Sequence, residues 1–369
     1  MAQLAKALSA EGHEVRIVTA RRDPRQPVHD SFAGMEVMRI PQIKVPQTQT
    51  AQYLARATSR VITLRRRGLA DVVHYHTFWP DAYTAFVVTK FVPTIYTCHE
   101  SRFLLMADAG RFSRRLKIAL KPFQGLIAPS TELLEVARQF GVSREQSVFV
   151  PNAVDAEAFS PSVERGFVRA HYHIPDDCFL ILCPRRLVPK NGINFLIESL
   201  SIISDRRLVR LLIVGDGPER ANLASLVRKL KLDESVIFAG SKPNADLPRF
   251  YADADAVAIP SLKEATSIAG LEAMSCARAV VATNVGGLPE IIEDQMTGLL
   301  VPPRDASGLA RAIESLIDQP ELRRRLGEAA RRRVEKEITW SHTARQTQLA
   351  YQQAIAVWQG SPIPRLVTA

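Results

Sequence analysis

The chain has few cysteines and no long apolar run. Its four cysteines, Cys98, Cys178, Cys183 and Cys276, form no C-x-x-C pair and have no metal-ligand spacing with histidine. They are therefore predicted to be buried or reduced thiols. No apolar run approaches the ~20 residues that a membrane-spanning helix needs, and the N-terminus lacks the apolar core of a signal peptide. These absences predict a soluble, cytoplasmic protein with no metal and no cofactor.

Length and charge narrow the class of protein further. With 369 residues, 46% of them hydrophobic, the chain is long enough for two domains with a core each. The net charge of +10 is uneven, because residues 1–160 hold 21 Lys and Arg against 14 Asp and Glu. A basic half suits nucleic acid, an anionic membrane surface or an acidic substrate. No helix-turn-helix, zinc-finger or RNA-binding signature accompanies it, so no nucleic-acid partner is predicted.

Short apolar segments alternate with amphipathic ones along the chain, which is typical of a parallel α/β sheet. In the first half, strands are expected at 14–20, 72–76, 94–98 and 126–129, with helices at 50–67 and 131–140. The stretch V-F-V-P-N-A-V-D-A-E-A-F-S-P, residues 148–161, is interpreted as a linker. The first half is thus predicted to be one Rossmann-like domain.

The same pattern restarts after the linker. Strands are expected at 180–183, 211–218, 235–240 and 255–260, and helices at 191–204, 219–230, 305–318, 320–336 and 340–358. The predicted domains are 1–158, 159–340, and a segment 341–369 whose helix packs back on the first domain before a tail. Two such domains face each other across a cleft, the commonest place for a small-molecule site.

One expected feature is missing at the start of the chain. An α/β half normally opens with a strand and a glycine-rich turn before its first helix. Here the sequence starts directly on that helix, M-A-Q-L-A-K-A-L-S-A. Either the sequence is a fragment with a late start or the protein has lost this loop. In the second case its activity is in doubt.

Charge, spacing and turn chemistry coincide at P-S-L-K-E-A-T-S-I-A-G-L-E-A-M-S-C, residues 260–276. The strand at 255–260 ends at Pro260, and a helix is expected over 268–276 with Thr266 or Ser267 as N-cap. Glu264 then lies in the loop beyond the strand, where ligands bind in open α/β sheets. The free N–H groups of the helix start suit a diphosphate. Glutamates at this spacing also occur as surface charges, so the surrounding motifs decide.

Those motifs run in order along nearly the whole chain. They are L-A-K-A-L-S-A-E-G-H-E-V-R-I-V-T (4–19), D-V-V-H-Y-H (71–76), T-C-H (97–99), V-P-N-A-V-D-A-E-A-F-S-P (150–161), R-R-L-V-P-K-N-G (185–192), V-G-D-G-P-E (214–219), V-I-F-A-G (236–240), and P-S-x-x-E-x7-E with G-G-L-P-E-I-I. In this register the sequence resembles the retaining GT-B glycosyltransferases of glycosyltransferase family 4. The resemblance implies a GT-B fold and a nucleotide-diphosphate sugar as co-substrate.

The resemblance implies that an arginine and a lysine stabilise the departing diphosphate. Arg186 matches the arginine. The family order is R-L-x-x-E-K-G, whereas this chain has R-L-V-P-K-N-G, so Asn191 fills the lysine slot. Lys190 can reach the phosphate from one residue away, because its side chain is long and flexible. The other interpretation of Lys190 is a surface lysine in a turn.

The remaining donor contacts are also implied by the resemblance. Glu264 would contact hydroxyls of the donor sugar, and Glu272 would accept hydrogen bonds from the ribose diol. The family's G-F-G after the first glutamate is replaced by Ala265, Thr266 and Ser267, so donor preference cannot be carried over. Further donor-binding positions are the amides of Thr266, Ser267 and Ile268, the turn residue Gly215, and Ser241 and Lys242 for the base.

His99 ends a strand of the first domain. In the family this histidine approaches the reacting sugar or the acceptor, and a structural histidine is the other interpretation. His74 and His76 resemble the family's H-x-H and are interpreted as structural. The catalytic set implied by the resemblance is therefore His99, Glu264, Arg186 and Lys190.

The resemblance also implies the mechanism. The family retains anomeric configuration by front-face attack, with the leaving phosphate oxygen accepting the acceptor's proton, so neither an enzyme nucleophile nor a metal is required. Paired carboxylates alone would also suit a glycoside hydrolase, but that does not explain Arg186 or the glycine turns. Two alternatives are kept. One is a non-catalytic homologue that binds nucleotide sugars or acts as a scaffold, and the weaker one is a nucleotide-sugar epimerase.

A basic amphipathic segment, R-F-S-R-R-L-K-I-A-L-K-P-F at 111–123, follows the apolar residues 103–106. Such a segment can lie on an anionic membrane surface. A solvated charged face over an ordinary core stripe is an equal interpretation. The predicted partners are a nucleotide-sugar donor, a glycan or lipid-linked acceptor, and an inner membrane face contacted through residues 103–123.

Overall fold

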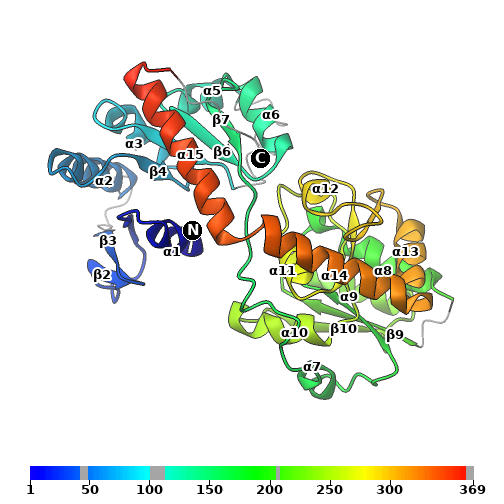
Figure 1. Cartoon of the computed structure of the whole chain (residues 1–369). Coiled ribbons are helices and arrows are strands. Elements are labelled where there is room, and N and C mark those ends of the chain that lie inside the picture. Colours follow the sequence, from blue (N-terminus) through cyan, green and yellow to red (C-terminus); the bar gives the residue numbers. More distant parts are fainter. Residues whose placement is uncertain (42–48, 100–112, 205–207, 363–369) are drawn as a thin grey trace. The chain divides into compact units, whose positions relative to one another are not determined.

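The computed structural model describes residues 1–41, 49–99, 113–204 and 208–362. The chain divides into two compact units, shown in Figure 1. Unit 1 comprises Met1–Pro151 together with Trp340–Ala369, and unit 2 comprises Asn152–Thr339. The sequence prediction sets the corresponding boundaries at 158 and 340.

Unit 2 is built on a six-stranded parallel sheet with the order β10-β9-β8-β11-β12-β13. Its strands are β8 (Phe179–Cys183), β9 (Val209–Val214), β10 (Val236–Gly240), β11 (Ala256–Ile259), β12 (Ala279–Thr283) and β13 (Leu299–Val301). The chain adds β9 and β10 on one side of β8, and then β11 to β13 on the other. The direction of winding therefore reverses between β8 and β11, which is where α/β sheets bind ligands.

Helices cover both faces of this sheet. They are α7 (Phe167–His171), α8 (Ile193–Ile202), α9 (Arg220–Lys229), α10 (Leu247–Asp253), α11 (Ile268–Ser275), α12 (Leu288–Ile291), α13 (Ala306–Asp318) and α14 (Pro320–Glu337). Every residue of β8 is buried. Ile181 and Cys183 pack into one apolar core, while Leu180 and Leu182 pack into the other. The strand is apolar throughout because both of its faces are covered.

Unit 1 contains two separate sheets among its described residues. In the first, of order β1-β3-β2, a hairpin adds an antiparallel strand to a parallel pair: β1 (Arg16–Arg21), β2 (His29–Phe32) and β3 (Met35–Pro41). The second is parallel, in sequence order: β4 (Val73–Tyr75), β5 (Thr94–Thr97), β6 (Gly125–Ala128) and β7 (Ser147–Phe149). No strand in the described part of the chain pairs with the free side of β1 or of β4.

In the described residues of unit 1, the helices are α1 (Ala2–Ala10), α2 (Gln49–Arg66), α3 (Ala82–Val88), α5 (Ser113–Leu120), α6 (Thr131–Gln139) and α15 (Trp340–Gln359). The C-terminal helix α15 packs against α1 and against β6, and Arg345 on α15 pairs with Glu11 at 3.2 Å. The last helix therefore folds with the first part of the chain. Of the segment 103–123, residues 103–112 lie outside the described residues.

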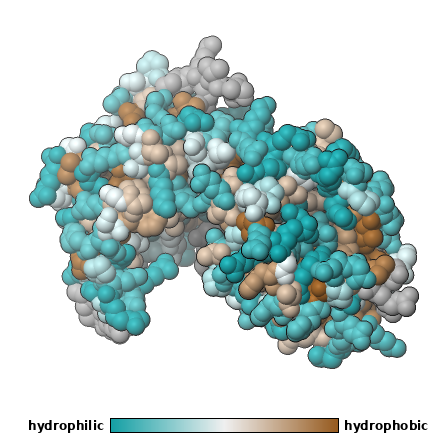
Figure 2. All heavy atoms as spheres, turned by 60° about the horizontal axis from the view of Figure 1, so that its bottom comes forward, coloured by the Kyte–Doolittle hydropathy of each residue, from teal (hydrophilic) through white to brown (hydrophobic). Residues whose placement is uncertain are grey.

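Most predicted strands and helices are confirmed to within a few residues, but the linker prediction is wrong at its start. Ser147–Phe149 forms β7, in which Val148 pairs with Ile127 of β6. The apolar V-F-V before Pro151 thus completes the sheet of unit 1 before the chain leaves it. Strands β2, β3, β12 and β13 are absent from the prediction. On the face shown in Figure 2, hydrophilic side chains cover most of each unit, and smaller hydrophobic areas are scattered among them.

Candidate active site

Two loops meet at the carboxyl edge of the sheet in unit 2, where the winding reverses. One follows β8 and contains Arg185, Arg186 and Lys190, and the other follows β11 and contains Glu264. The two loops are joined through the backbone, because the amide of Leu262 donates a hydrogen bond to the carbonyl of Lys190 at 2.8 Å. The two parts of the chain that are predicted from the sequence to bind the donor therefore lie side by side.

Glu264 is held by a buried ion pair with Arg185. Arg185 Nη2 donates to Glu264 Oε2, and also to Ser261 Oγ at 2.7 Å and to Asn191 Oδ1 at 3.0 Å. Ser261 Oγ donates to the same carboxylate at 3.1 Å. The side chains of Arg185 and Glu264 are only 10% and 7% exposed. A desolvated carboxylate fixed by a guanidinium and a hydroxyl has one orientation, which suits the recognition of a sugar.

Arg185 is absent from the sequence-predicted set, which names its neighbour. Arg186 is exposed to solvent, and its carbonyl accepts a hydrogen bond from Asn191 Nδ2 at 2.7 Å. Asn191 is buried within the turn η1 (Pro189–Asn191), and it links Arg185 to the carbonyl of Arg186. The asparagine in the lysine slot therefore braces the loop. Lys190 is half-buried beside it.

Glu272 lies in the first turns of α11 and is buried. Tyr251 of α10, also buried, donates its hydroxyl hydrogen to Glu272 Oε2 at 2.7 Å. Burial raises the pKa of Glu272 from 4.5 to about 7, and the hydrogen bond from Tyr251 partly opposes that rise. Buried carboxyl groups with strongly raised pKa values are common at functional sites.

The start of α11 has the geometry that the sequence predicts. Ser267 is the N-cap, and its hydroxyl accepts a hydrogen bond from the amide of Gly270 at 3.1 Å. Ile268, the first helical residue, is exposed. Thr266 Oγ1 is buried and has no hydrogen-bond partner within the described residues. A helix start with free amides and an unpaired hydroxyl can accept an anion or a sugar hydroxyl.

Gly215, Ser241 and Lys242 lie on the other side of the β8 loop. The amide of Gly215 donates to the carbonyl of Gly240 at 2.9 Å, which places the turn after β9 beside the loop after β10. Ser241 is exposed, and Lys242 Nζ lies 5.8 Å from the ring centroid of Tyr172. These residues therefore share the carboxyl edge with the glutamates.

Gly215 allows two loops to touch, and its replacement by alanine should be strongly destabilising. A Cβ atom at Gly215, where φ is +146°, would stand 2.2 Å from the carbonyl oxygen of Arg185. We expect Gly215→Ala to lower the free energy of unfolding by about 2–4 kcal/mol. Gly240→Ala is the matched control, since its φ is +71° but no atom lies within 4 Å. Urea unfolding of both variants checks the expectation, and equal losses would show that backbone strain alone accounts for the effect.

In unit 1, three histidines gather at the carboxyl ends of β4 and β5. His76 Nδ1 lies 3.0 Å from His99 Nε2, so one of the two nitrogens donates a hydrogen bond to the other. His74 contacts Tyr351 of α15 at 2.8 Å and Thr97 Oγ1 at 2.5 Å. Burial lowers the pKa of His99 to about 4 and that of His76 to about 3. His99 is thus a neutral imidazole oriented by His76, a residue that the sequence reading sets aside as structural.

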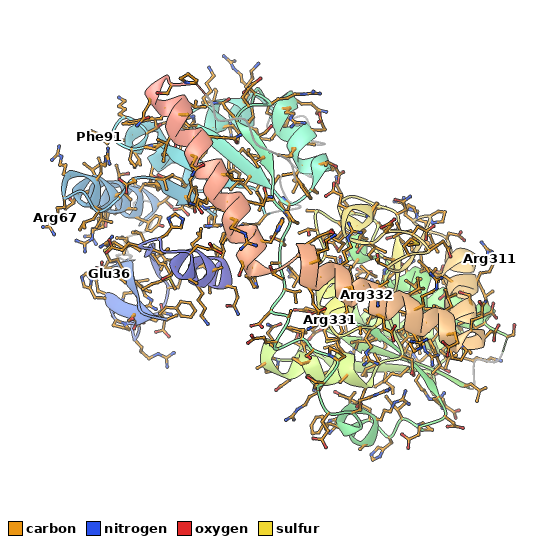
Figure 3. The ribbon with its side chains drawn as sticks, viewed as in Figure 1. Glu36, Arg67, Phe91, Arg311, Arg331 and Arg332 are labelled. Atoms are coloured by element: carbon orange, nitrogen blue, oxygen red, sulfur yellow. The ribbon has the colours of Figure 1, made fainter. Side chains whose placement is uncertain are left out.

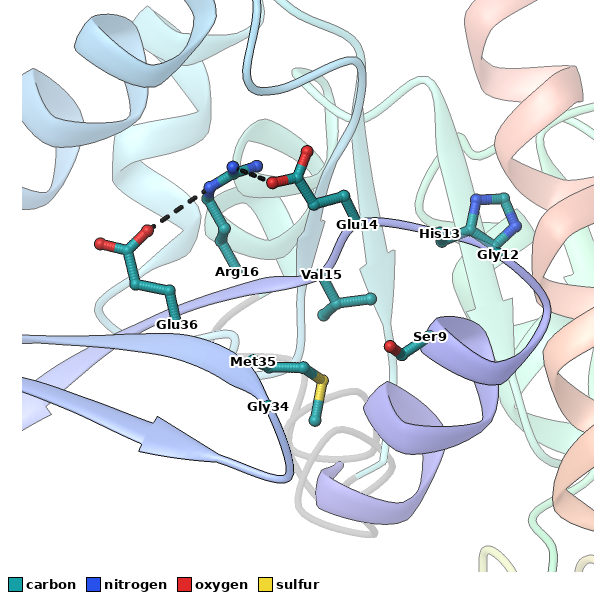
Figure 4. A pocket seen from close by; sticks show the side chains of 9 residues that line it. All are labelled: Ser9, Gly12, His13, Glu14, Val15, Arg16, Gly34, Met35 and Glu36. Carbon is teal, nitrogen blue, oxygen red and sulfur yellow. Dashed lines mark hydrogen bonds and ion pairs between the residues drawn. The ribbon is translucent and has the colours of Figure 1, made fainter.

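Unit 1 also has a surface hollow, which does not include these three histidines. It has a volume of about 450 Å³ and is lined by the end of α1 and the starts of β1 and β3. Figure 4 shows Arg16 between Glu14 and Glu36, with which it forms ion pairs. Two carboxylates of the lining therefore share one guanidinium. This hollow lies at the amino ends of its strands, whereas the histidines and the glutamates lie at carboxyl ends.

Among the described residues, none of the helices is long and apolar enough to cross a bilayer. Within the same residues, no group of three or more His, Cys, Asp and Glu side chains is placed to hold a metal ion. The four cysteines are buried and unpaired by disulfides.

Comparison with known sequences finds two families, one for each half of the chain. Residues 164–333 match the model of the glycosyl transferases group 1, and residues 1–158 match that of Glycosyltransferase Family 4. Among curated proteins, the D-inositol 3-phosphate glycosyltransferase of Pseudarthrobacter chlorophenolicus is 29% identical over 98% of this chain and 91% of its own. The match thus extends over both units.

Solved structures give the same result for the fold. Sucrose-phosphate synthase from Thermosynechococcus elongatus superimposes with a TM-score of 0.80 at 26% identity, covering 96% of this chain and 92% of that one. HepE of Anabaena, solved in complex with UDP and glucose, has a TM-score of 0.76 at 20% identity over 94% of each chain. These similarities confirm the predicted fold class, an α/β fold of the GT-B type.

Proposed function

Since the chain belongs to the glycosyltransferases whose group 1 and family 4 models match its two halves, we propose that it takes its sugar from a nucleotide-diphosphate donor and passes it to a glycan or lipid-linked acceptor. The observation that carries the proposal is the junction of the β8 and β11 loops, where buried Glu264 and Arg185 lie beside Lys190. That HepE is solved with UDP and glucose supports a nucleotide sugar as donor.

Each donor group has a partner of suitable chemistry in unit 2. Glu264 accepts hydrogen bonds from sugar hydroxyls and stabilises positive charge at the anomeric carbon. Glu272 accepts hydrogen bonds from the ribose diol, because one carboxylate offers two acceptor oxygens. The diphosphate binds the amides at the start of α11, with Arg186 and Lys190 as its cations. Ser241 and Lys242 lie on the neighbouring loop, where they serve the base.

The transfer that we propose retains the anomeric configuration. The bond between the anomeric carbon and the phosphate oxygen breaks while the acceptor oxygen bonds to the same face of that carbon. The acceptor's proton passes to the departing phosphate oxygen, whose growing charge Arg186 and Lys190 stabilise. The step needs no enzyme nucleophile and no metal ion. His99, neutral and oriented by His76, accepts or donates a hydrogen bond at the sugar or acceptor.

The acceptor and the place of action are the finer parts of the proposal. The name of the Pseudarthrobacter relative, D-inositol 3-phosphate glycosyltransferase, makes a phosphorylated polyol the first soluble acceptor to test. The basic half of the chain also suits an anionic acceptor or a lipid-linked one. Four buried cysteines without a disulfide favour a reducing compartment such as the cytoplasm.

Nucleoside diphosphates test the donor half directly. We expect UDP, ADP or GDP to raise the unfolding temperature of the full chain, and the matching nucleotide sugar to be hydrolysed slowly or transferred. No stabilisation by any of the three would contradict the proposal. Stabilisation without hydrolysis or transfer would instead favour a nucleotide-sugar-binding protein.

Arg186→Ala should weaken nucleoside diphosphate binding by roughly tenfold or more, the value of a charge-assisted hydrogen bond. Because Arg186 is exposed, its loss should change the unfolding free energy by less than about 0.5 kcal/mol. The matched control is Arg332→Ala, an exposed arginine on α14 (Figure 3). Isothermal titration calorimetry measures the affinities, and equal affinities in the two variants would remove Arg186 from the phosphate site.

A further inference from the structure

Large apolar side chains line the outer face of α3 in unit 1. Trp79, Tyr83, Val87 and Phe91 recur at every fourth position, and they are 66%, 41%, 44% and 37% exposed. Tyr83 and Val87 lie four residues apart within α3 (Ala82–Val88) and so share one side of the helix. Trp79 precedes the helix and is joined to Pro80 by a cis peptide bond, and Phe91 lies in the turn that follows the helix. These four exposed side chains are called the stripe.

The stripe is distinct from the core-facing side of the same helix. Ala82, Ala85 and Val88 of α3 are buried against the rest of unit 1. The rings of Trp79 and Tyr83 meet edge to face with their centroids 4.9 Å apart, so the exposed aromatics are in contact with each other. Single exposed apolar residues are ordinary, but a contiguous group of them commonly marks a binding surface.

Helices α2 and α5 pack on either side of α3. Because α3 connects β4 to β5 and α5 connects β5 to β6, right-handed crossovers put both helices on the same face of the sheet. Arg65 Nε donates to the carbonyl of Phe91 at 3.2 Å, which fixes the end of α2 beside the end of the stripe. Figure 3 shows Arg67 and Phe91 at this side of unit 1. The stripe thus lies in the middle of a layer of helices.

The exposed charges of this layer are almost all positive. The basic ones near the stripe are at the end of α2, in the turn after α3, and along α5: Arg66, Arg67, Lys90, Arg114, Arg115, Lys117 and Lys121. Within residues 60–99 and 113–121, Asp71 is the exposed acidic side chain. Ile118 of α5 adds a further exposed apolar group among the cations. The layer is therefore an apolar stripe with basic borders.

We propose that the outer face of α2, α3 and α5 docks on an anionic lipid surface. Aromatic and aliphatic side chains enter the boundary between headgroups and acyl chains, while the arginines and lysines contact lipid phosphates. A second copy of this chain would bring two basic faces together, and a single-stranded nucleic acid would leave Val87 and Ile118 without a stacking partner. The docking brings the protein to the lipid-linked acceptor of the proposed function, on which this part rests. Lipid binding itself can be measured without any transfer.

Flotation of the full chain with vesicles tests the docking. We expect binding to vesicles of equal parts phosphatidylcholine and phosphatidylglycerol, weakening with salt, and little binding to phosphatidylcholine alone. Val87→Glu should reduce binding at least tenfold. The substitution places a charged group where an apolar side chain enters the lipid, and its negative charge is repelled by the anionic headgroups. Ile202→Glu, at an exposed apolar position of unit 2, is the matched control and should bind like the parent chain. Thermal unfolding of each variant confirms that it folds.

The tryptophan of the stripe gives a second readout. Tryptophan emission of the parent chain should shift to shorter wavelength on binding the mixed vesicles, and Trp79→Phe should remove most of that shift. Three outcomes would overturn the proposal: no binding to the anionic vesicles, equal loss in Val87→Glu and Ile202→Glu, or salt-independent binding to phosphatidylcholine alone. Self-association that Val87→Glu abolishes, without lipid binding, would identify the face as an interface between copies. Failure of transfer alone would leave the docking intact.

Discussion

Arg185→Ala is expected to abolish sugar transfer and to lower the free energy of unfolding by about 3–5 kcal/mol. The substitution leaves the Glu264 carboxylate buried with Ser261 as its remaining hydrogen-bond donor in the network. Removing one partner of a buried ion pair costs far more than losing an exposed pair, because the other charge stays desolvated. Activity assays with the donor that binds, and urea unfolding, measure the two effects.

An exposed arginine of unit 2 that also forms ion pairs with glutamate is the control for the loss of one positive charge. On α14, Arg324 lies 2.8 Å from Glu321 Oε2 and 2.8 Å from Glu328 Oε1, and the three side chains are 61%, 82% and 44% exposed. Arg324→Ala should change the unfolding free energy by less than about 1 kcal/mol and leave transfer unchanged. A similar loss of stability in both variants would contradict the buried character of the Arg185–Glu264 pair.

A double substitution separates the structural part of the pair from its chemical part. Replacing a buried ion pair by apolar residues of similar volume is often neutral for stability. Arg185→Met combined with Glu264→Leu should therefore recover most of the stability that Arg185→Ala loses, while transfer stays absent. Recovery of transfer together with stability would mean that the pair only braces the loops and that the donor sugar is recognised elsewhere.

Much of unit 2 could be predicted because its local signals agree with one another. The apolar strands β8 and β11, the turn at Pro260 and the N-cap Ser267 each lie where the sequence places them. The choice between Arg185 and Arg186 could not be made in this way. Successive side chains leave an extended backbone on opposite sides, and the residue that faces Glu264 depends on how the β8 loop leaves the sheet. The course of this loop depends on contacts of Arg185 with Ser261 and Asn191.

The missed hairpin of unit 1 has a different cause. Strands β2 and β3 are joined by Ala33 and Gly34, both with positive φ, which is the geometry of a tight two-residue hairpin. Asparagine or aspartate before glycine is the usual signal for that turn, and an alanine at φ +49° gives none. Similarly, Tyr251 and His76 act through side chains 21 and 23 residues away in sequence. Only the folded chain brings these partners together.

Glu272→Gln is expected to stabilise the ligand-free protein while weakening nucleotide binding. The pKa of Glu272 rises from 4.5 to about 7 on folding, so between these values the folded state holds a proton that the unfolded state has lost. Stability therefore falls as pH rises from about 4.5 to 7, and the destabilisation is complete above about pH 8. Glutamine removes a destabilisation on the order of 3 kcal/mol there. Urea unfolding at about pH 5 and pH 8 should show the gain at the higher pH.

The same substitution should cost affinity, because a neutral amide accepts weaker hydrogen bonds from the ribose than a carboxylate does. A loss of roughly tenfold to a hundredfold is expected at about pH 8. A variant that gains stability and loses affinity would show that the carboxylate is kept for binding, since it does not serve the fold. Unchanged affinity would contradict the ribose role. Gain in stability at pH 5 as large as at pH 8 would contradict the raised pKa.

Tyr251→Phe tests the same carboxyl group without removing it. The Tyr251 hydroxyl donates to Glu272 and so lowers the pKa of that carboxyl. Without this donor the pKa of Glu272 should rise further, so the carboxylate forms only at higher pH. The pH-dependent increase in nucleotide affinity should therefore occur at higher pH than in the parent chain. The phosphates of the ligand titrate as well. Glu272→Gln has no titrating group at this position, so its affinity at each pH measures the contribution of the phosphates. If the nucleotide affinity of Tyr251→Phe has the same pH dependence as that of the parent chain, Tyr251 does not tune the pKa of Glu272. If the curve of affinity against pH is displaced to higher pH, nucleotide binding depends on the charge of Glu272.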